Sequence, residues 1–220
     1  MIFRDMHHIL IFLVGDMAFL PIEVLLVTLI IHRVLSEREK LARLEKLNMV
    51  IESFFSEVGW DILTYFSNFD PKLSNIKKDL MMTSEWSDKD FYNVYQILKN
   101  FDFAVNSHEL DLENLRIFLR EKRTFLLLLL QNPNLLEHES FTELLMAVFH
   151  LTEELIKRKD LTSLPATDYD HLSGDIKRVY GLLINQWLDY MKYLLREYPY
   201  LFSLAMRTNP FDEEASPIVR

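Results

Sequence analysis

The sequence predicts an all-α protein in which a single N-terminal transmembrane helix continues into a cytoplasmic multi-helix bundle. Two observations indicate this fold. An apolar run of 23 residues, Ile9 to Ile31, lies near the N-terminus. In the rest of the chain, apolar residues recur every three or four positions, which is typical of amphipathic helices. No stretch shows the alternation of apolar and polar β-branched residues that is typical of a strand.

The apolar run is long enough to span a bilayer. As a helix it reaches roughly 34 Å, and the hydrocarbon core is about 30 Å thick. Sixteen of its 23 residues are Ile, Leu, Phe or Val, and together they favour insertion by roughly 5 to 9 kcal/mol. Asp16 and Glu23 oppose insertion by about 2.5 to 3.5 kcal/mol each, so the balance favours a span. The alternative is a helix buried in the core of a soluble bundle.

The charges beside the run predict its orientation. One strong cation, Arg4, precedes the run, whereas several follow it. Because Lys and Arg favour the cytoplasmic side of a membrane, we expect an exterior N-terminus and a cytoplasmic C-terminal domain in a single-pass protein of the cell membrane. The cations after the run are Arg33, Arg38, Lys40, Arg43 and Lys46.

The two carboxylates inside the run are candidate contact residues. Asp16 and Glu23 are seven residues apart, two helical turns, and therefore share one face. Intramembrane carboxylates usually face a partner or a cavity, because facing lipid is expensive. This favours contact with another membrane protein or a second copy of the chain. In the alternative, Asp16 is protonated and Glu23 reaches the interface or a local water defect.

Composition excludes several classes of protein. From Arg33 onward there are 23 basic and 30 acidic residues, and an acidic domain repels nucleic-acid phosphate. Without cysteine, disulfides, thiol catalysis and Cys-ligated zinc are excluded. Four glycines in the whole chain leave no glycine-rich phosphate loop. We expect no cofactor and no nucleic-acid partner.

The segment after the apolar run is predicted to be one long helix, from about Ser36 to Asn68. No breaker separates it from the apolar run, so we expect the two to be continuous. Its apolar stripe repeats every three or four residues and consists of Leu44, Leu47, Ile51, Phe54, Val58, Ile62 and Phe66.

Local signals divide the remaining chain into shorter helices. Asp70-Pro71 is an N-cap followed by proline at the first helical position. Ser140 with Glu143 is the pattern of a capping box, and Pro199 breaks the helix before it. The expected helices are Pro71–Met82, Ser87–Val105, Glu109–Gln131, Ser140–Lys159, Asp168–Glu197 and a short helix reaching Met206.

These elements predict three parts of the chain. Residues 1–34 form the transmembrane anchor, and residues 35–208 form the helical bundle domain. Residues 209–220 contain two prolines and several charges, which is typical of an extended tail.

Two pairs of residues could bind a metal ion. His150 and Glu154 are four residues apart on one predicted helix, and His171 and Asp175 are four apart on another. If these helices packed antiparallel, two imidazoles and two carboxylates would meet, a donor set that binds divalent ions. Solvated or helix-capping roles are the alternative. The basic run after Glu154, Lys157 to Lys159, is expected only to complement the negative end of its helix.

Three stretches resemble a family of uncharacterised prokaryotic membrane-anchored all-helical proteins. They are Leu47-Asn-Met-Val-Ile-Glu-Ser-Phe-Phe-Ser-Glu-Val-Gly59, Asn132-Pro-Asn-Leu-Leu-Glu-His-Glu-Ser-Phe-Thr-Glu143 and Ser203-Leu-Ala-Met-Arg-Thr-Asn-Pro-Phe-Asp212. The resemblance covers most of the chain and implies a prokaryotic origin and a single N-terminal span. It implies no activity and no catalytic residues.

These features favour a membrane-tethered, non-enzymatic adaptor or accessory subunit. In this hypothesis the membrane helix and the acidic bundle bind a protein partner. The alternative is a ligand- or metal-binding helical bundle that uses the two His–carboxylate pairs, and an enzyme is one form of that alternative.

Overall fold

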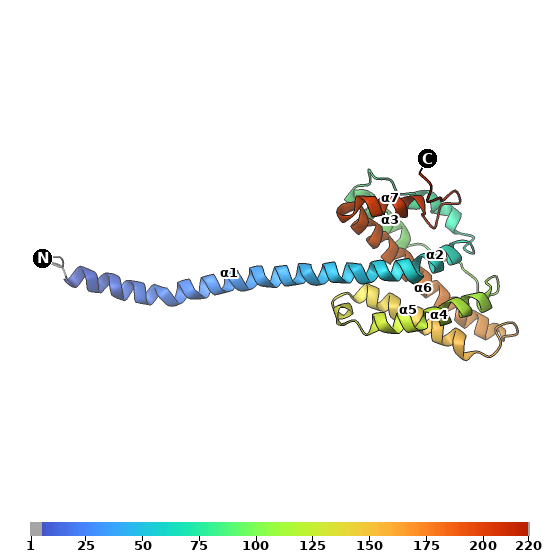
Figure 1. The fold of residues 1–220 in the computed structure, drawn as a ribbon, viewed down its shortest axis with the longest axis horizontal. Coiled ribbons are helices and arrows are strands. Elements are labelled where there is room, and N and C mark those ends of the chain that lie inside the picture. Colours follow the sequence, from blue (N-terminus) through green and yellow to red (C-terminus); the bar gives the residue numbers. More distant parts are fainter. Residues whose placement is uncertain (1–5, 220) are drawn as a thin grey trace. The chain divides into compact units, whose positions relative to one another are not determined.

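The computed structural model describes residues 6–219, and every regular element in that range is a helix or helical turn (Figure 1). The predicted all-α class is therefore confirmed for the described residues. The chain divides into two units, Met1–Lys46 and Leu47–Arg220. Within helices, a few side chains lie outside the description: those of His7, His8, Asp16, Leu41, Arg43, Leu44, Leu136 and Glu137.

The described part of the first unit belongs to one helix, α1 (Met6–Phe54). The large apolar side chains between Ile9 and Leu35 are exposed. Among the described residues, this is the one helix that is long and apolar enough to cross a membrane, by length and composition. Pro21 lies inside it, a position that membrane helices tolerate better than soluble ones.

The second unit contains the end of α1 and the remaining helices. A π-helical turn, η1 (Phe55–Gly59), separates α1 from α2 (Trp60–Ser67), so the predicted long helix is interrupted near its end. The elements that follow are η2 (Leu73–Asn75), η3 (Lys77–Leu80), α3 (Asp88–Lys99), α4 (Leu112–Leu130), η4 (Pro133–Glu137), α5 (Glu139–Lys157), α6 (Ala166–Glu197) and α7 (Pro199–Arg207).

Three predicted local features are wrong. The expected helix Pro71–Met82 is replaced by two short 3-10 turns, and Asp70 accepts a hydrogen bond from the backbone N–H of Lys72 instead of capping a helix. Helix α5 is capped by His138, whose Nδ1 accepts from the N–H of Phe141, rather than by a Ser140 capping box. The helix expected from Ser87 starts there, with a capping box between Ser87 and Asp90, but it ends at Lys99 instead of Val105.

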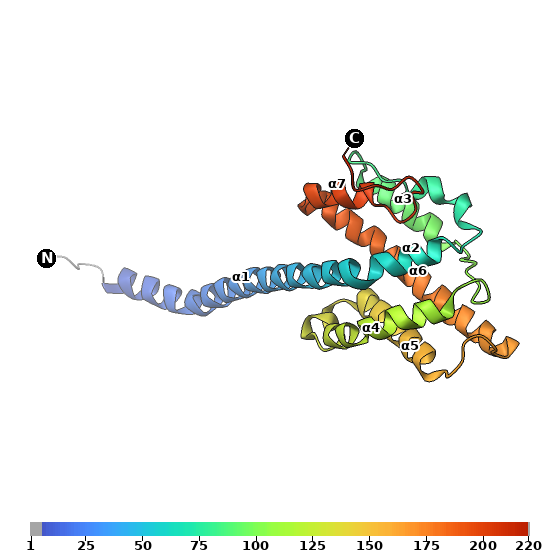
Figure 2. The same ribbon diagram turned by 45° about the vertical axis from the view of Figure 1, so that its right-hand side comes forward.

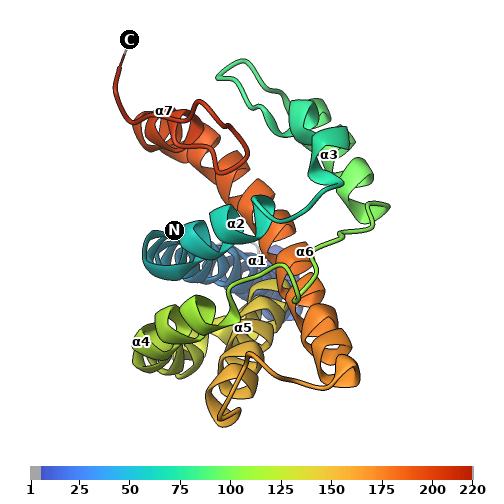
Figure 3. The same cartoon turned by 90° about the vertical axis from the view of Figure 1, so that its right-hand side faces the viewer.

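Helix α6 organises the core of the second unit. It packs against α2, α3, α5 and α7, and Figure 3 shows it running from the side of α4 and α5 to the side of α3 and α7. Helices α4 and α5 lie side by side (Figure 2). Ser140 hydrogen-bonds to Gln186, whereas His150 lies beside Asp175, so α5 and α6 are antiparallel.

The segment after α7 packs back onto this core. Phe211 is buried, and its ring centroid lies 4.9 Å from that of Trp187. The side-chain amide of Asn209 donates to the carbonyl oxygen of Leu80 at 2.9 Å. These two contacts fix the first residues of the segment that was predicted to be an extended tail. The domain limits at residues 34 and 208 stay predictions.

Aromatic rings pack tightly around the π-helical turn. The ring of Phe54 lies 5.5 Å from the rings of both Phe55 and Phe141, and Phe55 stacks on Tyr190 at 5.0 Å. A Cβ atom on Gly59 would lie 2.8 Å from carbons of both Phe54 and Phe55. Gly59 therefore leaves room that the two buried rings need.

We expect Gly59→Ala to lower the free energy of unfolding by about 1 to 2 kcal/mol. Overpacking costs about 1 to 3 kcal/mol, and the higher helix propensity of Ala offsets part of it. Gly174→Ala is the matched control, because nothing lies within 4 Å of its added Cβ in α6. That variant should gain up to about 1 kcal/mol. Chemical unfolding followed by circular dichroism measures both, and a Gly59→Ala variant as stable as the parent would contradict the packing.

Candidate functional site

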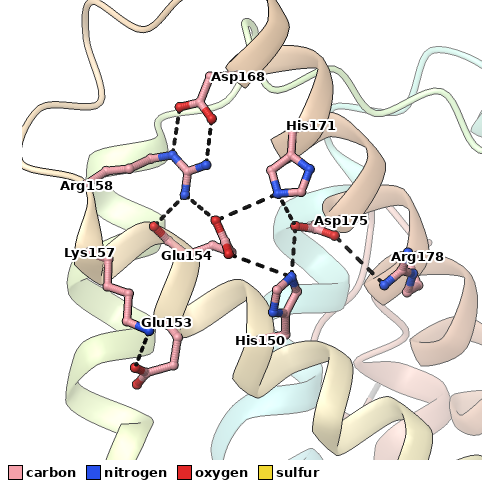
Figure 4. A network of polar contacts seen from close by, with 9 residues as sticks. All are labelled: His150, Glu153, Glu154, Lys157, Arg158, Asp168, His171, Asp175 and Arg178. Carbon is pink, nitrogen blue, oxygen red and sulfur yellow. Dashed lines mark hydrogen bonds and ion pairs between the residues drawn. The ribbon is translucent and has the colours of Figure 1, made fainter.

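The two predicted His–carboxylate pairs meet between α5 and α6. His150 and Glu154 lie one turn apart on α5, and His171 and Asp175 lie one turn apart on α6. Because the two helices are antiparallel, the pairs lie at the same level and their side chains point toward one another (Figure 4). The structure thus brings together all four residues that the spacing singled out.

Asp175 lies at the centre of this cluster. Its Oδ2 lies 3.4 Å from the Nε2 of His150 and 3.4 Å from the Nε2 of His171. Glu154 lies slightly farther away, with Oε1 3.9 Å from the Nε2 of His150 and Oε2 3.7 Å from that of His171. We call His150, Glu154, His171 and Asp175 the His–Asp cluster.

Burial differs sharply within the His–Asp cluster. Asp175 is 6% exposed, and its Oδ2 has no hydrogen-bond partner among the described residues. The His150 and His171 side chains are about half exposed, at 47% and 51%. The guanidinium of Arg178 approaches the other carboxylate oxygen, Oδ1, at 4.0 Å. A buried carboxylate therefore lies beside two half-exposed imidazoles.

Arg158 forms a second layer beside the cluster. Its guanidinium donates two hydrogen bonds to the Asp168 carboxylate, at 2.8 and 2.7 Å. It also donates to Oε2 of Glu154 at 2.6 Å and to the backbone carbonyl of Glu154 at 2.7 Å. From the sequence, this arginine was expected only to complement the negative end of its helix. Its i,i+4 spacing from Glu154 was the available signal for a specific partner.

These hydrogen bonds lower the pKa values of the Glu154 and Asp168 carboxyl groups. The bond from Arg158 is the main reason that the pKa of Glu154 lies below its usual value, and the charges of His150 and His171 add to the effect. The same guanidinium lowers the pKa of Asp168. Both groups are therefore carboxylates at neutral pH, and Glu154 is anchored on the side away from the imidazoles.

The donor set of this cluster is one that can bind a cation. Imidazole nitrogens and carboxylate oxygens are the usual ligands of divalent transition metals in proteins. Glu154, Asp168 and Asp175 bring three negative charges to a small region in which Arg158 and Arg178 are the nearby arginines. The arrangement suits a further positive charge between α5 and α6.

The other predicted site residues lie in the first unit. Asp16 and Glu23 both belong to α1, and Glu23 is exposed. The side chain of Asp16 lies outside the described residues. Contact of these carboxylates with a partner stays a prediction.

We expect Arg158→Lys to lower the free energy of unfolding by about 1 to 2 kcal/mol at pH 7. Lysine keeps the charge but loses the two parallel hydrogen bonds to Asp168, and hydrogen bonds to charged groups are worth about 1.5 to 3 kcal/mol. Because the pKa of Asp168 is lowered in the folded state, its contribution is present above the unfolded-state pKa. It is lost as the pH falls through the folded-state pKa.

Chemical unfolding at several pH values tests this. The difference between parent and variant should shrink below about pH 4. Arg120→Lys on the exposed surface of α4 is the control and should have little effect at any pH. An Arg158→Lys penalty that is unchanged in acid would contradict the role of the Asp168 carboxylate.

Comparison with known proteins identifies relatives of the whole chain. Residues 43–207 match the model of a family described as "Uncharacterized protein MJ1433, C-terminal helical domain", and residues 1–35 match "MJ1433, N-terminal helical domain". The chain is 49% identical over 215 residues to "Uncharacterized protein MJ1433" of Methanocaldococcus jannaschii, which covers 98% of this chain and 86% of that protein. No solved structure matches. The chain belongs to this family of uncharacterised helical proteins.

Proposed function

We propose that the protein is a membrane-tethered, non-enzymatic accessory subunit. In this proposal α1 spans a bilayer, and the second unit binds a protein partner at the cytoplasmic face. The observation that carries the proposal is the long apolar stretch of α1, whose large side chains are exposed from Ile9 to Leu35.

Apolar surface surrounds α1 in this stretch. The consecutive residues Leu25, Leu26 and Val27 are 62%, 54% and 54% exposed. Successive helical residues point about 100° apart, so exposed apolar neighbours indicate an apolar surface on every side. None of the apolar window is buried by the rest of the described chain. Such a helix is stable when hydrocarbon or another protein covers it, and its length fits hydrocarbon.

Charge supports a cytoplasmic second unit. Arg33, Arg38 and Lys40 follow the apolar stretch within a few residues, and cations close to a span favour the cytoplasmic side. They also suit anionic headgroups, although Glu37 and Glu39 lie among them. The domain beyond is acidic and is therefore suited to a protein partner rather than to nucleic acid.

The two carboxylates of α1 supply the contact with a partner inside the bilayer. Asp16 and Glu23 share one face of the helix. Gly15 and Ala18 lie next to Asp16 in sequence, and small residues allow another helix to approach closely. A polar group that faces a neighbouring helix avoids the cost of facing lipid. The partner is another membrane protein or a second copy of this chain.

Two arginines in the span should release the protein from the membrane. Replacing Leu20 and Leu26 by Arg costs about 3 to 4 kcal/mol each on the insertion scale, more than the few kcal/mol that favour the native span. Carbonate extraction of membranes should leave the parent in the pellet and the double variant in the supernatant or degraded. Leu128→Arg with Met146→Arg, on exposed positions of the second unit, is the control and should stay in the pellet. A parent chain that carbonate releases would refute the anchor.

Replacing both intramembrane carboxylates should weaken association. Interhelical polar contacts in membranes are worth about 1 to 2 kcal/mol, so Asp16→Ala with Glu23→Ala should weaken binding about tenfold. Mass measurement and co-purification in mild detergent report this. Glu37→Ala with Glu45→Ala makes the same charge change outside the span and should have no effect. If parent and variant show the same mass and the same co-purifying proteins, the docking role is excluded.

A further inference from the structure

We propose that His150, His171 and Asp175 bind a divalent transition metal ion of the zinc type, with one coordination position left open beside Glu154. The proposal is independent of membrane anchoring, because all four residues lie on α5 and α6 of the second unit.

The distances in the cluster fit a shared ion better than direct pairing. A charge-assisted hydrogen bond between imidazole and carboxylate is about 2.7 to 2.9 Å long. Both Nε2–Oδ2 distances are instead 3.4 Å. Zinc–ligand bonds of about 2.0 to 2.1 Å in a tetrahedron place neighbouring ligand atoms about 3.3 to 3.4 Å apart. One ligand atom from each of the three residues lies within 4.8 Å of the other two. Two of the three ligand pairs therefore have the separation expected around one ion, and the two imidazole nitrogens lie within 4.8 Å of each other.

The burial of Asp175 is an independent indication of a cation. Its Oδ2 points at the two imidazoles, yet no described group donates a hydrogen bond to it. An ionised oxygen that is removed from water without a partner is strongly unfavourable. Arg178 approaches only the other oxygen, at 4.0 Å. An ion bound between Oδ2 and the imidazoles would supply the missing partner.

Glu154 lies next to this position without joining it. Its carboxylate oxygens are 3.9 and 3.7 Å from the two imidazole nitrogens, and Oε2 is held by Arg158 at 2.6 Å. Arg158 is in turn fixed by two hydrogen bonds to Asp168. Glu154 would therefore act as a positioning residue, and its carboxylate could accept a hydrogen bond from a water molecule at the fourth position of a bound ion. Three protein ligands and one open position are typical of reactive rather than structural zinc sites.

The two imidazoles and one carboxylate of the proposed site also indicate which class of metal ion binds there. Two imidazoles favour zinc, iron(II) or copper over magnesium and calcium, which prefer sites made entirely of oxygen ligands. The half-exposed imidazoles give the ion a path from solvent.

Calorimetric titration of the full chain in detergent tests the proposal, with protein purified without a polyhistidine tag. ZnCl₂ should bind at one equivalent and raise the midpoint of thermal unfolding, and CoCl₂ should give the visible absorption of a tetrahedral site. MgCl₂ should bind at least 100-fold more weakly. His150→Ala, His171→Ala and Asp175→Asn should each weaken zinc binding at least tenfold. Glu154→Gln should weaken it less than Asp175→Asn.

Matched controls keep the test decisive. His108→Ala removes a histidine that packs on Tyr169 and is not among the described residues that pair with His150, His171 or Asp175, so this variant should bind zinc as the parent does. Zinc should no longer shift the unfolding midpoint of Asp175→Asn, because this substitution removes the one carboxylate ligand of the ion. Failure of the parent to bind zinc or cobalt would overturn the proposal. So would binding that the three ligand substitutions leave unchanged, or binding of magnesium as tightly as zinc.

Discussion

The antiparallel packing of α5 against α6 is the contact on which the rest of the second unit depends. Helix α6 has 32 residues and buries side chains along its whole length, among them Tyr180 and Trp187. Several shorter helices must cover a helix of this length, and α5 covers its N-terminal half with fully buried residues such as Phe141 and Leu151. Helices α3 and α7 and the end of the chain cover the other half. Removing this apolar surface from water is the dominant favourable term in the folding of such a unit.

The same packing sets the register of the polar side chains. The contact begins at Ser140 and Gln186 and ends at Arg158 and Asp168, next to the connection between the two helices. Charged side chains of α5 and α6 therefore gather at one end of the interface between these two helices, and the rest of that interface is mainly apolar. The pair of hydrogen bonds from Arg158 to Asp168 holds that end together, and it lies only one turn from the imidazoles of the His–Asp cluster. The stability of the helix pair and the electrostatics of the cluster are consequently coupled.

The two units differ in how far their apolar side chains are buried. In the second unit, apolar residues lie on one stripe of each helix and meet in a common core. In the first unit, apolar residues surround α1 and none of the apolar window is buried. The relative in Methanocaldococcus jannaschii aligns with 98% of this chain, so the alignment includes both kinds of helix. A helix of the first kind folds with its neighbours, whereas one of the second kind needs a covering that the described chain does not provide.

The helical class and the approximate limits of the long helices follow from the sequence alone, because the 3.6-residue period and the breaker residues act over a few positions. The shared helix faces of His150 and Glu154, and likewise of His171 and Asp175, also follow from the sequence. Local sequence preferences did not predict the structure correctly where two local conformations or two capping residues are close in free energy. Examples are the 3-10 turns after Pro71 and the His138 cap of α5.

The position of the two His–carboxylate pairs at the same level depends on the packing of α5 on α6 and could not be predicted from local sequence. The binding of Arg158 to both Glu154 and Asp168, and the room that Gly59 leaves for two phenylalanine rings, are likewise visible only in the tertiary structure. These contacts depend on which helix faces meet and in what register. The apolar packing of α5 on α6 fixes both, and no local pattern in the sequence encodes that choice.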